Sequence, residues 1–164
     1  MRFTHYFLIC FTLLFSFGLS GCSGERPVEK AILGTWVQET PISMTSDGLQ
    51  TTTADSVLKL NKNGEVLLTR NLDIAGAGLP ADGVKLSIEL RGQWEIIEGQ
   101  LKQTQDTALI MPRTSDDTAQ GWADKLQAQA DQSPPSVKDI ISVGKKELIL
   151  QDTQSGSTDI YRRK

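Results

Sequence analysis

The stretch VKLSIELR, residues 84–91, alternates strictly between apolar and polar side chains. Val84, Leu86, Ile88 and Leu90 fall on one side, and the residues between them are charged or carry a hydroxyl. Successive side chains of a β-strand point to opposite faces of a sheet, so this period of two predicts a strand with one wet and one buried face. We expect the four apolar residues either to fill a core or to line a ligand cavity.

Similar short segments recur on both sides of this stretch, separated by turn residues. Asn61-Lys62-Asn63-Gly64 predicts a hairpin because Asn and Gly accept the positive φ that a tight turn requires. Glu98-Gly99 predicts another, close to Trp94, which we also expect in the core or in a cavity wall. Pro41–Thr53, rich in Ser and Thr around Asp47-Gly48, is expected to be a loop. The expected strands are Ile32–Glu39, Ser56–Leu60, Glu65–Ile74, 84–91, Gly92–Ile97, Gln100–Thr104, Asp139–Val143, Glu147–Gln151 and Thr158–Arg163.

Eight or nine such strands, most of them joined by hairpins, indicate a mainly β protein. An up-and-down antiparallel β-barrel of the lipocalin-like kind is the expected architecture, because closure removes the exposed strand edges. An open, strongly curved sheet is the alternative that the pattern leaves open.

One segment has the period of a helix. Its apolar residues form an amphipathic stripe at Ala119, Trp122, Ala123, Leu126 and Ala130. Thr114 and Asp117 have the spacing of a capping box, and Pro134-Pro135 ends the pattern. We expect this inserted helix to lie outside the barrel or across one end, anchored by Trp122. The alternative is a lid or a partner-docking helix that presents Trp122 and Leu126.

The first residues have the pattern of a secretory leader. A positive charge at Arg2 precedes an apolar run over 6–17, which is shorter than the roughly 20 residues of a transmembrane helix. The tetrapeptide Leu19-Ser20-Gly21-Cys22 then resembles the lipobox of bacterial lipoproteins. That resemblance implies cleavage before Cys22, a diacylglycerol on its thiol and an acylated amine. Ser23 after the cysteine resembles an outer-membrane address, so we expect a lipid anchor on the periplasmic side of the outer membrane.

These features divide the chain into a signal peptide (1–21), a lipidated tether (22–30) and one domain (31–164). Removing the leader leaves 143 residues with a formal charge of −4 and takes away His5 and Cys10. With Cys22 lipidated, no disulfide, zinc site or histidine-dependent triad can form. We therefore expect no catalytic residues, no metal, no cofactor and no enzymatic activity. A mild acidic balance also argues against nucleic-acid binding.

Three short motifs point to a family. Gly34-Thr35-Trp36, the similar Gly92-Gln93-Trp94 and the closing Tyr161-Arg162-Arg163 resemble those of small bacterial lipocalin-like domains of the calycin group. In that group a tryptophan on the first strand closes the barrel floor, and an arginine from near the chain end lies across its indole. By resemblance, Trp36 would pair with Arg162 or Arg163 in a structural role.

Two classes of function remain open. The first is a binding module that holds a small apolar ligand in its barrel. The second is an interaction or scaffold lipoprotein, whose barrel is filled by its own side chains and whose surface meets an envelope protein. An eight-stranded barrel permits both, because its interior is just wide enough to be packed or to hold one ligand.

Overall fold

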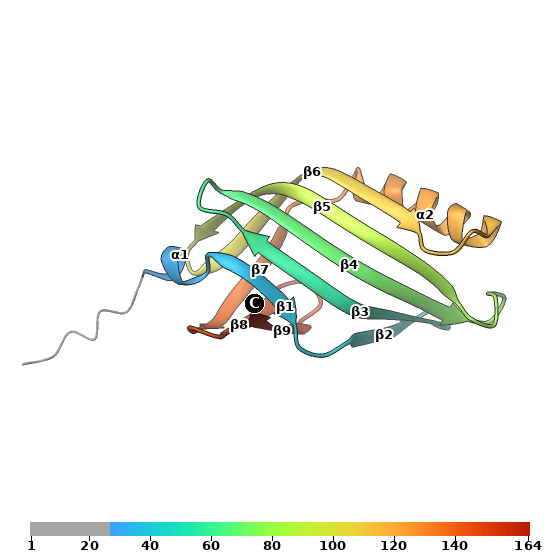
Figure 1. The fold of residues 1–164 in the computed structure, drawn as a ribbon, viewed down its shortest axis with the longest axis horizontal. Coiled ribbons are helices and arrows are strands. Elements are labelled where there is room, and N and C mark those ends of the chain that lie inside the picture. Colours follow the sequence, from blue (N-terminus) through green and yellow to red (C-terminus); the bar gives the residue numbers. More distant parts are fainter. Residues whose placement is uncertain (1–26) are drawn as a thin grey trace, which may run out of the picture.

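The computed structural model describes residues 27–164, which form an antiparallel β-barrel with one helix inserted between the sixth and seventh strands (Figure 1). The expected mainly β fold and its inserted helix are therefore confirmed, and the closed barrel is realised rather than the open sheet. The helices are α1 (Val28–Ala31) and α2 (Asp117–Ala130), and the strands are β1 (Gly34–Gln38), β2 (Ile42–Ser46), β3 (Leu49–Leu60), β4 (Glu65–Gly76), β5 (Val84–Ile97), β6 (Gln100–Pro112), β7 (Ser136–Val143), β8 (Glu147–Asp152) and β9 (Thr158–Arg163).

The barrel closes at β1, which is paired on both of its edges. Gly34–Val37 run antiparallel to the end of β3, and Trp36–Gln38 run antiparallel to β9. Each remaining barrel strand pairs with its neighbours in chain order, from β3 to β9. β2 is the additional strand, and it pairs only with the first half of β3.

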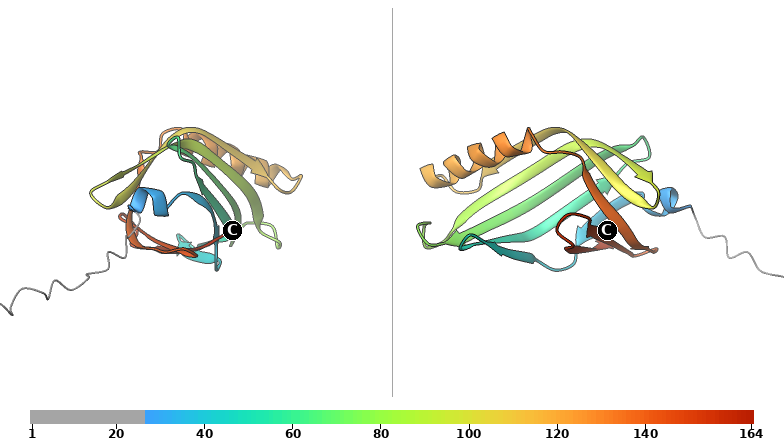
Figure 2. Two further views of the ribbon diagram at one scale, coloured as in Figure 1. Left: turned by 60° about the vertical axis from the view of Figure 1, so that its left-hand side comes forward. Right: turned by 180° about the vertical axis from the view of Figure 1, so that it is seen from behind.

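The barrel has two different ends (Figure 2). We call one the α1 end, because α1 lies there together with the β3–β4, β5–β6 and β7–β8 turns and the end of β9. Strands β3 to β6 are 12 to 14 residues long, about twice the length of β1, β8 and β9. They therefore continue past the closed barrel as an open sheet. α2 packs on β5 and β6 of this continuation, which we call the α2 end.

Two hydrophobic clusters correspond to these two parts. The first fills the barrel near the α1 end with Ile32, Trp36, Leu58, Leu60, Val66, Leu68, Leu101, Leu148, Leu150 and Tyr161. The second lies between α2 and the extended strands and contains Ile74, Val84, Leu86, Ala119 and Ala123. The strand residues of both clusters follow one continuous inward-facing register along β4 and β5. α2 thus covers the inner face of the sheet, beyond the closed barrel.

The side chain of Gln127 on α2 forms hydrogen bonds with the backbone of β6, along an edge that has no neighbouring strand. β7 pairs only with Gln100–Gln103, which leaves the second half of β6 without a neighbouring strand. The Gln127 side chain accepts a hydrogen bond from the Ile110 backbone N–H at 3.1 Å and donates one to the Ala108 carbonyl at 3.1 Å. One side-chain amide thereby supplies the two bonds of a missing strand, which protects an edge that would otherwise pair with other chains.

The region expected to be a loop, Pro41–Thr53, is instead the β2–β3 hairpin, so that prediction was wrong. Asp47 and Gly48 both adopt positive φ, 52° and 75°, as a two-residue hairpin turn requires. The flanking segments are rich in Ser and Thr, yet β-branched threonine fits a pleated surface well. The polar composition of this segment therefore did not distinguish a strand from a loop.

Other boundaries also differ from the sequence expectation. The expected tether reaches residue 30, but Val28–Ala31 already form α1, and the first strand begins at Gly34 instead of Ile32. The segments 84–91 and Gly92–Ile97 are one continuous strand, β5, and β6 continues to Pro112.

The expected capping box of α2 was also wrong. Asp116 is the N-cap, and its carboxylate accepts a bond from the Ala119 N–H at 2.7 Å. Thr114 donates a hydrogen bond to the same carboxylate. This bond is the main cause that lowers the pKa of Asp116, and the bond from the Ala119 N–H is the second.

Gly92 permits a close approach of β5 and β6. A Cβ at this position would overlap the Thr104 carbonyl of β6, where the β5–β6 register shifts by one residue. The Gly-x-Trp motif here therefore reflects close strand packing.

None of the helices within residues 27–164 has the length and apolar character needed to cross a bilayer.

Candidate functional site: a polar pocket at the barrel mouth

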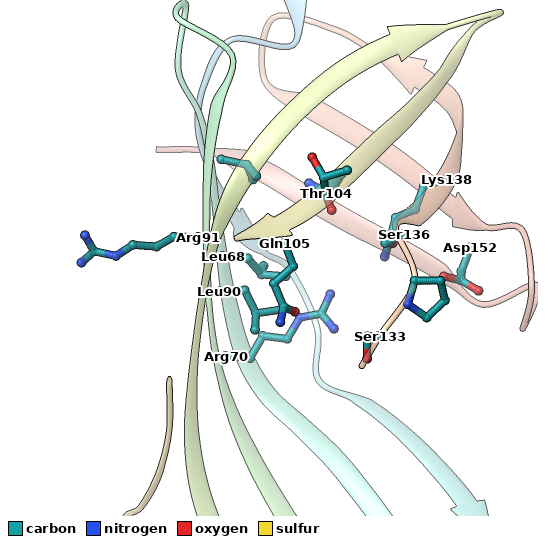
Figure 3. Close-up of a pocket in the computed structure, with 13 residues that line it drawn as sticks. Leu68, Arg70, Leu90, Arg91, Thr104, Gln105, Ser133, Ser136, Lys138 and Asp152 are labelled. Carbon is teal, nitrogen blue, oxygen red and sulfur yellow. The ribbon is translucent and has the colours of Figure 1, made fainter. Parts of the chain in front are cut away.

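A pocket of about 240 Å³ lies where the barrel passes into the extended sheet (Figure 3). Val66, Leu68 and Leu90 form its apolar wall. Ser133 and Pro134, from the segment that joins α2 to β7, contribute to its lining as well. The pocket therefore depends on both parts of the fold.

Arg70 is the charged residue in the inward register of β4. The inward positions read Val66, Leu68, Arg70, Leu72 and Ile74, so one guanidinium interrupts an otherwise apolar row. It lies between the two hydrophobic clusters, where the pocket opens. This residue was missed in the sequence, although a charge at an inward position of an alternating strand was the signal that could have identified it.

A buried ion pair lies beside Arg70. Lys138 on β7 lines the pocket and donates a hydrogen bond to Asp159 on β9. The two residues are only 8% and 6% exposed. Arg70 Nη2 is 4.0 Å from the same carboxylate oxygen. The Asp159 carboxylate is thus shared by two cations, and Lys138 is the closer one, so Arg70 has only the longer contact.

Three buried donor groups in this region have no hydrogen-bond partner among residues 27–164. They are Arg70 Nε, Gln103 Nε2 and Ser56 Oγ. Ser56 lies directly opposite Arg70 in the β3–β4 register, and Gln103 lines the pocket from β6. Leaving a buried polar group unsatisfied costs about 1–3 kcal/mol, and more for a charged one. Arg70 and Gln103 both line the pocket, so a hydrogen-bond acceptor there would lie next to two of these three residues.

Asp152 is the carboxylate on the pocket rim, and it is occupied by its own turn. Its Oδ1 accepts hydrogen bonds from the Ser155 N–H at 2.8 Å, the Ser155 hydroxyl at 2.9 Å and the Gln154 N–H at 3.1 Å. The bond from the Ser155 backbone is the main cause that lowers the pKa of Asp152. The carboxylate is therefore ionised at neutral pH and does not act as a proton donor to a ligand.

The apolar residues expected to line a cavity or fill the core have different surroundings. Val84 and Leu86 are fully buried in the second cluster under α2. Ile88 is half-buried on the same face, whereas Leu90 lines the pocket. Trp94 packs against the first cluster, and its indole N–H donates to the Asn61 carbonyl at 3.0 Å.

The residues expected for partner docking, Trp122 and Leu126, both pack against the second cluster. Trp122 also lies under the Lys125 ammonium, 4.9 Å from the ring centroid. Their packing matches the expectation of an anchoring helix more closely than that of a docking helix.

The structure places Arg163, not Arg162, across Trp36. The Arg163 guanidinium carbon is 4.0 Å from the indole centroid, and the guanidinium donates to the carbonyls of Ala31 at 2.6 Å and Lys145 at 2.8 Å. The indole N–H of Trp36 donates to the Ile32 carbonyl at 2.7 Å. Arg162 and Arg163 are adjacent on β9, so their side chains point to opposite faces of the sheet.

Arg162 points outward and pairs with Glu39 at 3.0 Å and Glu147 at 2.8 Å. The hydrogen bond that Arg162 donates to the Glu39 carboxylate is the main cause that raises the pKa of Arg162.

Cys22, the expected lipidation site, lies outside the described residues. Within residues 27–164 no group of three or more Asp, Glu, His or Cys side chains is arranged to hold a metal ion. No family model matches the chain, and no curated protein matches it either.

We predict that Arg163→Lys destabilises the barrel and that Arg162→Lys does not. A lysine keeps the charge but loses the flat stack on Trp36 and the fork of donors to the backbone carbonyls. The expected loss is about 1–3 kcal/mol in the free energy of unfolding, whereas the exposed ion pairs of Arg162 contribute about 0–1 kcal/mol. Urea unfolding of the two variants measures both values, and equal losses would contradict a specific closing role for Arg163.

Proposed function

We propose that the protein is a lipid-anchored binding protein of the bacterial outer membrane, and that its barrel-mouth pocket takes a small amphipathic carboxylate. The observation that carries this proposal is that two residues lining the pocket, Arg70 and Gln103, have buried donors without partners among residues 27–164. A carboxylate accepts several hydrogen bonds and balances a cation, so it satisfies both needs of this site.

The apolar wall supplies the other half of the recognition. Val66, Leu68 and Leu90 offer hydrocarbon contacts on the side of the pocket that adjoins the first cluster. At about 240 Å³, the pocket is smaller than the roughly 300–1,000 Å³ of typical drug-sized sites. The barrel beyond it is filled by side chains, with Trp36, Tyr161 and Leu101 almost completely buried. These dimensions favour a short carboxylate over a long acyl chain.

The same packing argues against the scaffold alternative. A docking helix would present its apolar stripe to a partner, but Ala119 and Ala123 are fully buried and Trp122 packs against the second cluster. The residues of the pocket also support binding rather than catalysis, because after residue 22 the chain has neither histidine nor cysteine to act as a base or nucleophile.

Hexanoate and hexanol form a matched pair of probes for the pocket. We predict that hexanoate shifts the backbone NMR signals of Arg70, Leu90 and Lys138 in a saturable manner, and that hexanol binds at least tenfold more weakly. Arg70→Gln should weaken hexanoate binding by about tenfold or more, because a charged hydrogen bond contributes about 1.5–3 kcal/mol. Arg113→Gln, outside the pocket, is the control and should change neither affinity.

Two results would contradict this proposal in different ways. Equal binding of hexanoate and hexanol would exclude recognition of the carboxylate. Unchanged signals with both probes would exclude this pocket as the binding site.

The proposed anchor is tested separately at Cys22. We predict that Cys22→Ser abolishes incorporation of labelled palmitate and prevents lipid attachment, since the thiol is the group that takes up the diacylglycerol. Cys10→Ser, which changes the other cysteine of the chain, is the matched control and should leave both unchanged. Undiminished palmitate incorporation in the Cys22→Ser variant would refute lipidation at this residue.

A further inference from the structure

Exposed lysines gather at the α1 end of the barrel. They come from α1, the β3–β4 turn, the β7–β8 turn and the residue after β9, and they are Lys30, Lys62, Lys145, Lys146 and Lys164. None of the five forms an ion pair with another residue in the range 27–164. We call these five residues the basic end.

The barrel closure brings these segments together although they are distant in sequence. Lys164 donates its backbone N–H to the Thr35 carbonyl at 3.0 Å, and Arg163 donates to the Lys146 carbonyl at 2.9 Å. The pairing of Gly34 with the end of β3 sets the β3–β4 turn beside the start of β1. Arg163, held among backbone carbonyls, adds a sixth positive charge.

The carboxylates at this end are fewer than the cations. Glu29, Glu65 and Glu98 lie in or beside α1 and the turns, Asp139 lies beside the β5–β6 turn and accepts a hydrogen bond from Gln100 at 2.8 Å, and Glu147 is already paired with Arg162 at 2.8 Å. The opposite end has the reverse balance, with exposed acidic residues at Asp47, Asp82, Asp117, Asp124 and Asp131. The chain as a whole has a formal charge of −3, so this end is more positive than the chain as a whole.

Exposed apolar side chains accompany the lysines. Val28 on α1 is 39% exposed, Ile97 at the end of β5 is 43% exposed, and Ile141 at the β7 bulge is 56% exposed. The Ile140 N–H bonds to the Gly99 carbonyl, so the bulge lies beside the β5–β6 turn. Basic residues mixed with exposed apolar ones are characteristic of surfaces that bind at the boundary of headgroups and acyl chains.

We propose that the basic end lies against the anionic surface of a lipid bilayer, with the α2 end directed away from it. The chain enters the barrel at this same end, at residue 27. Five residue steps separate Pro27 from Cys22, a reach of at most about 18 Å. An anchor at Cys22 would therefore hold Pro27, where the chain enters this end of the barrel, within about two Debye lengths of the headgroups.

Binding of the lipid-free chain 23–164 to vesicles tests this surface without relying on the anchor or on any pocket ligand. All the contacts that close the barrel and form both clusters lie within this chain. We expect co-sedimentation with phosphatidylcholine vesicles that contain about 30% phosphatidylglycerol, and release by high salt. Each lysine near such a surface contributes about fivefold to the partition coefficient.

Two double variants with the same change in net charge distinguish this face from overall charge. Lys145→Glu/Lys146→Glu should lower the partition coefficient at least tenfold, whereas Lys85→Glu/Lys125→Glu, at the α2 end, should change it less than twofold. Thermal unfolding of both variants checks that each is folded. Absence of binding by the parent chain, equal losses in the two variants, or equal binding to pure phosphatidylcholine would each overturn the proposal.

Discussion

The whole structure depends on β1 being hydrogen-bonded along both edges. This five-residue strand joins β3 to β9, the two strands that would otherwise be the edges of an open sheet. Trp36 occupies its centre and is fully buried, while Arg163 from β9 covers the indole and ties the preceding residues to the chain end through their carbonyls. Strand β1, the buried Trp36 and the Arg163 that covers its indole therefore close the barrel together.

The difference in strand length then determines where a ligand can bind. Four long strands cannot all be paired around a barrel closed by short ones, so their inner face continues beyond it and is covered by α2. Each part has its own apolar cluster, and the polar residues Arg70, Gln103 and Lys138 lie at the junction. A polar site at such a junction lies between the two clusters, and the barrel interior is filled by the side chains of the first one. The pocket lies away from the α1 end, which leaves that end available for the proposed contact with a membrane.

The parts of the fold that follow from local pattern could be predicted from the sequence. The alternation at residues 84–91 gave a strand and its buried face, and the stripe that contains Trp122 gave the helix. The β2–β3 hairpin was missed because its strands carry Thr and Ser in place of an apolar alternation. The choice between Arg162 and Arg163 could not be made either, since it depends on which side of β9 faces Trp36.

The pocket was the least predictable feature. Its residues come from the five strands β4 to β8 and from the segment after α2, and only the closed sheet brings them together. The alternation along β4 could mark Arg70 as an inward-facing charge, but its neighbours in the pocket follow only from the long-range strand pairing. Long-range pairing, rather than residue type, therefore defines the site.

Amide hydrogen exchange of β1 is the most direct test of this account. If β1 closes the barrel, the amides of Trp36 and Val37 should be protected as strongly as those in the centre of β4, because both strands would open only when the barrel unfolds. Exchange of β1 and β9 at the rate of free edge strands, while β4 and β5 stay protected, would show an open sheet and contradict the account.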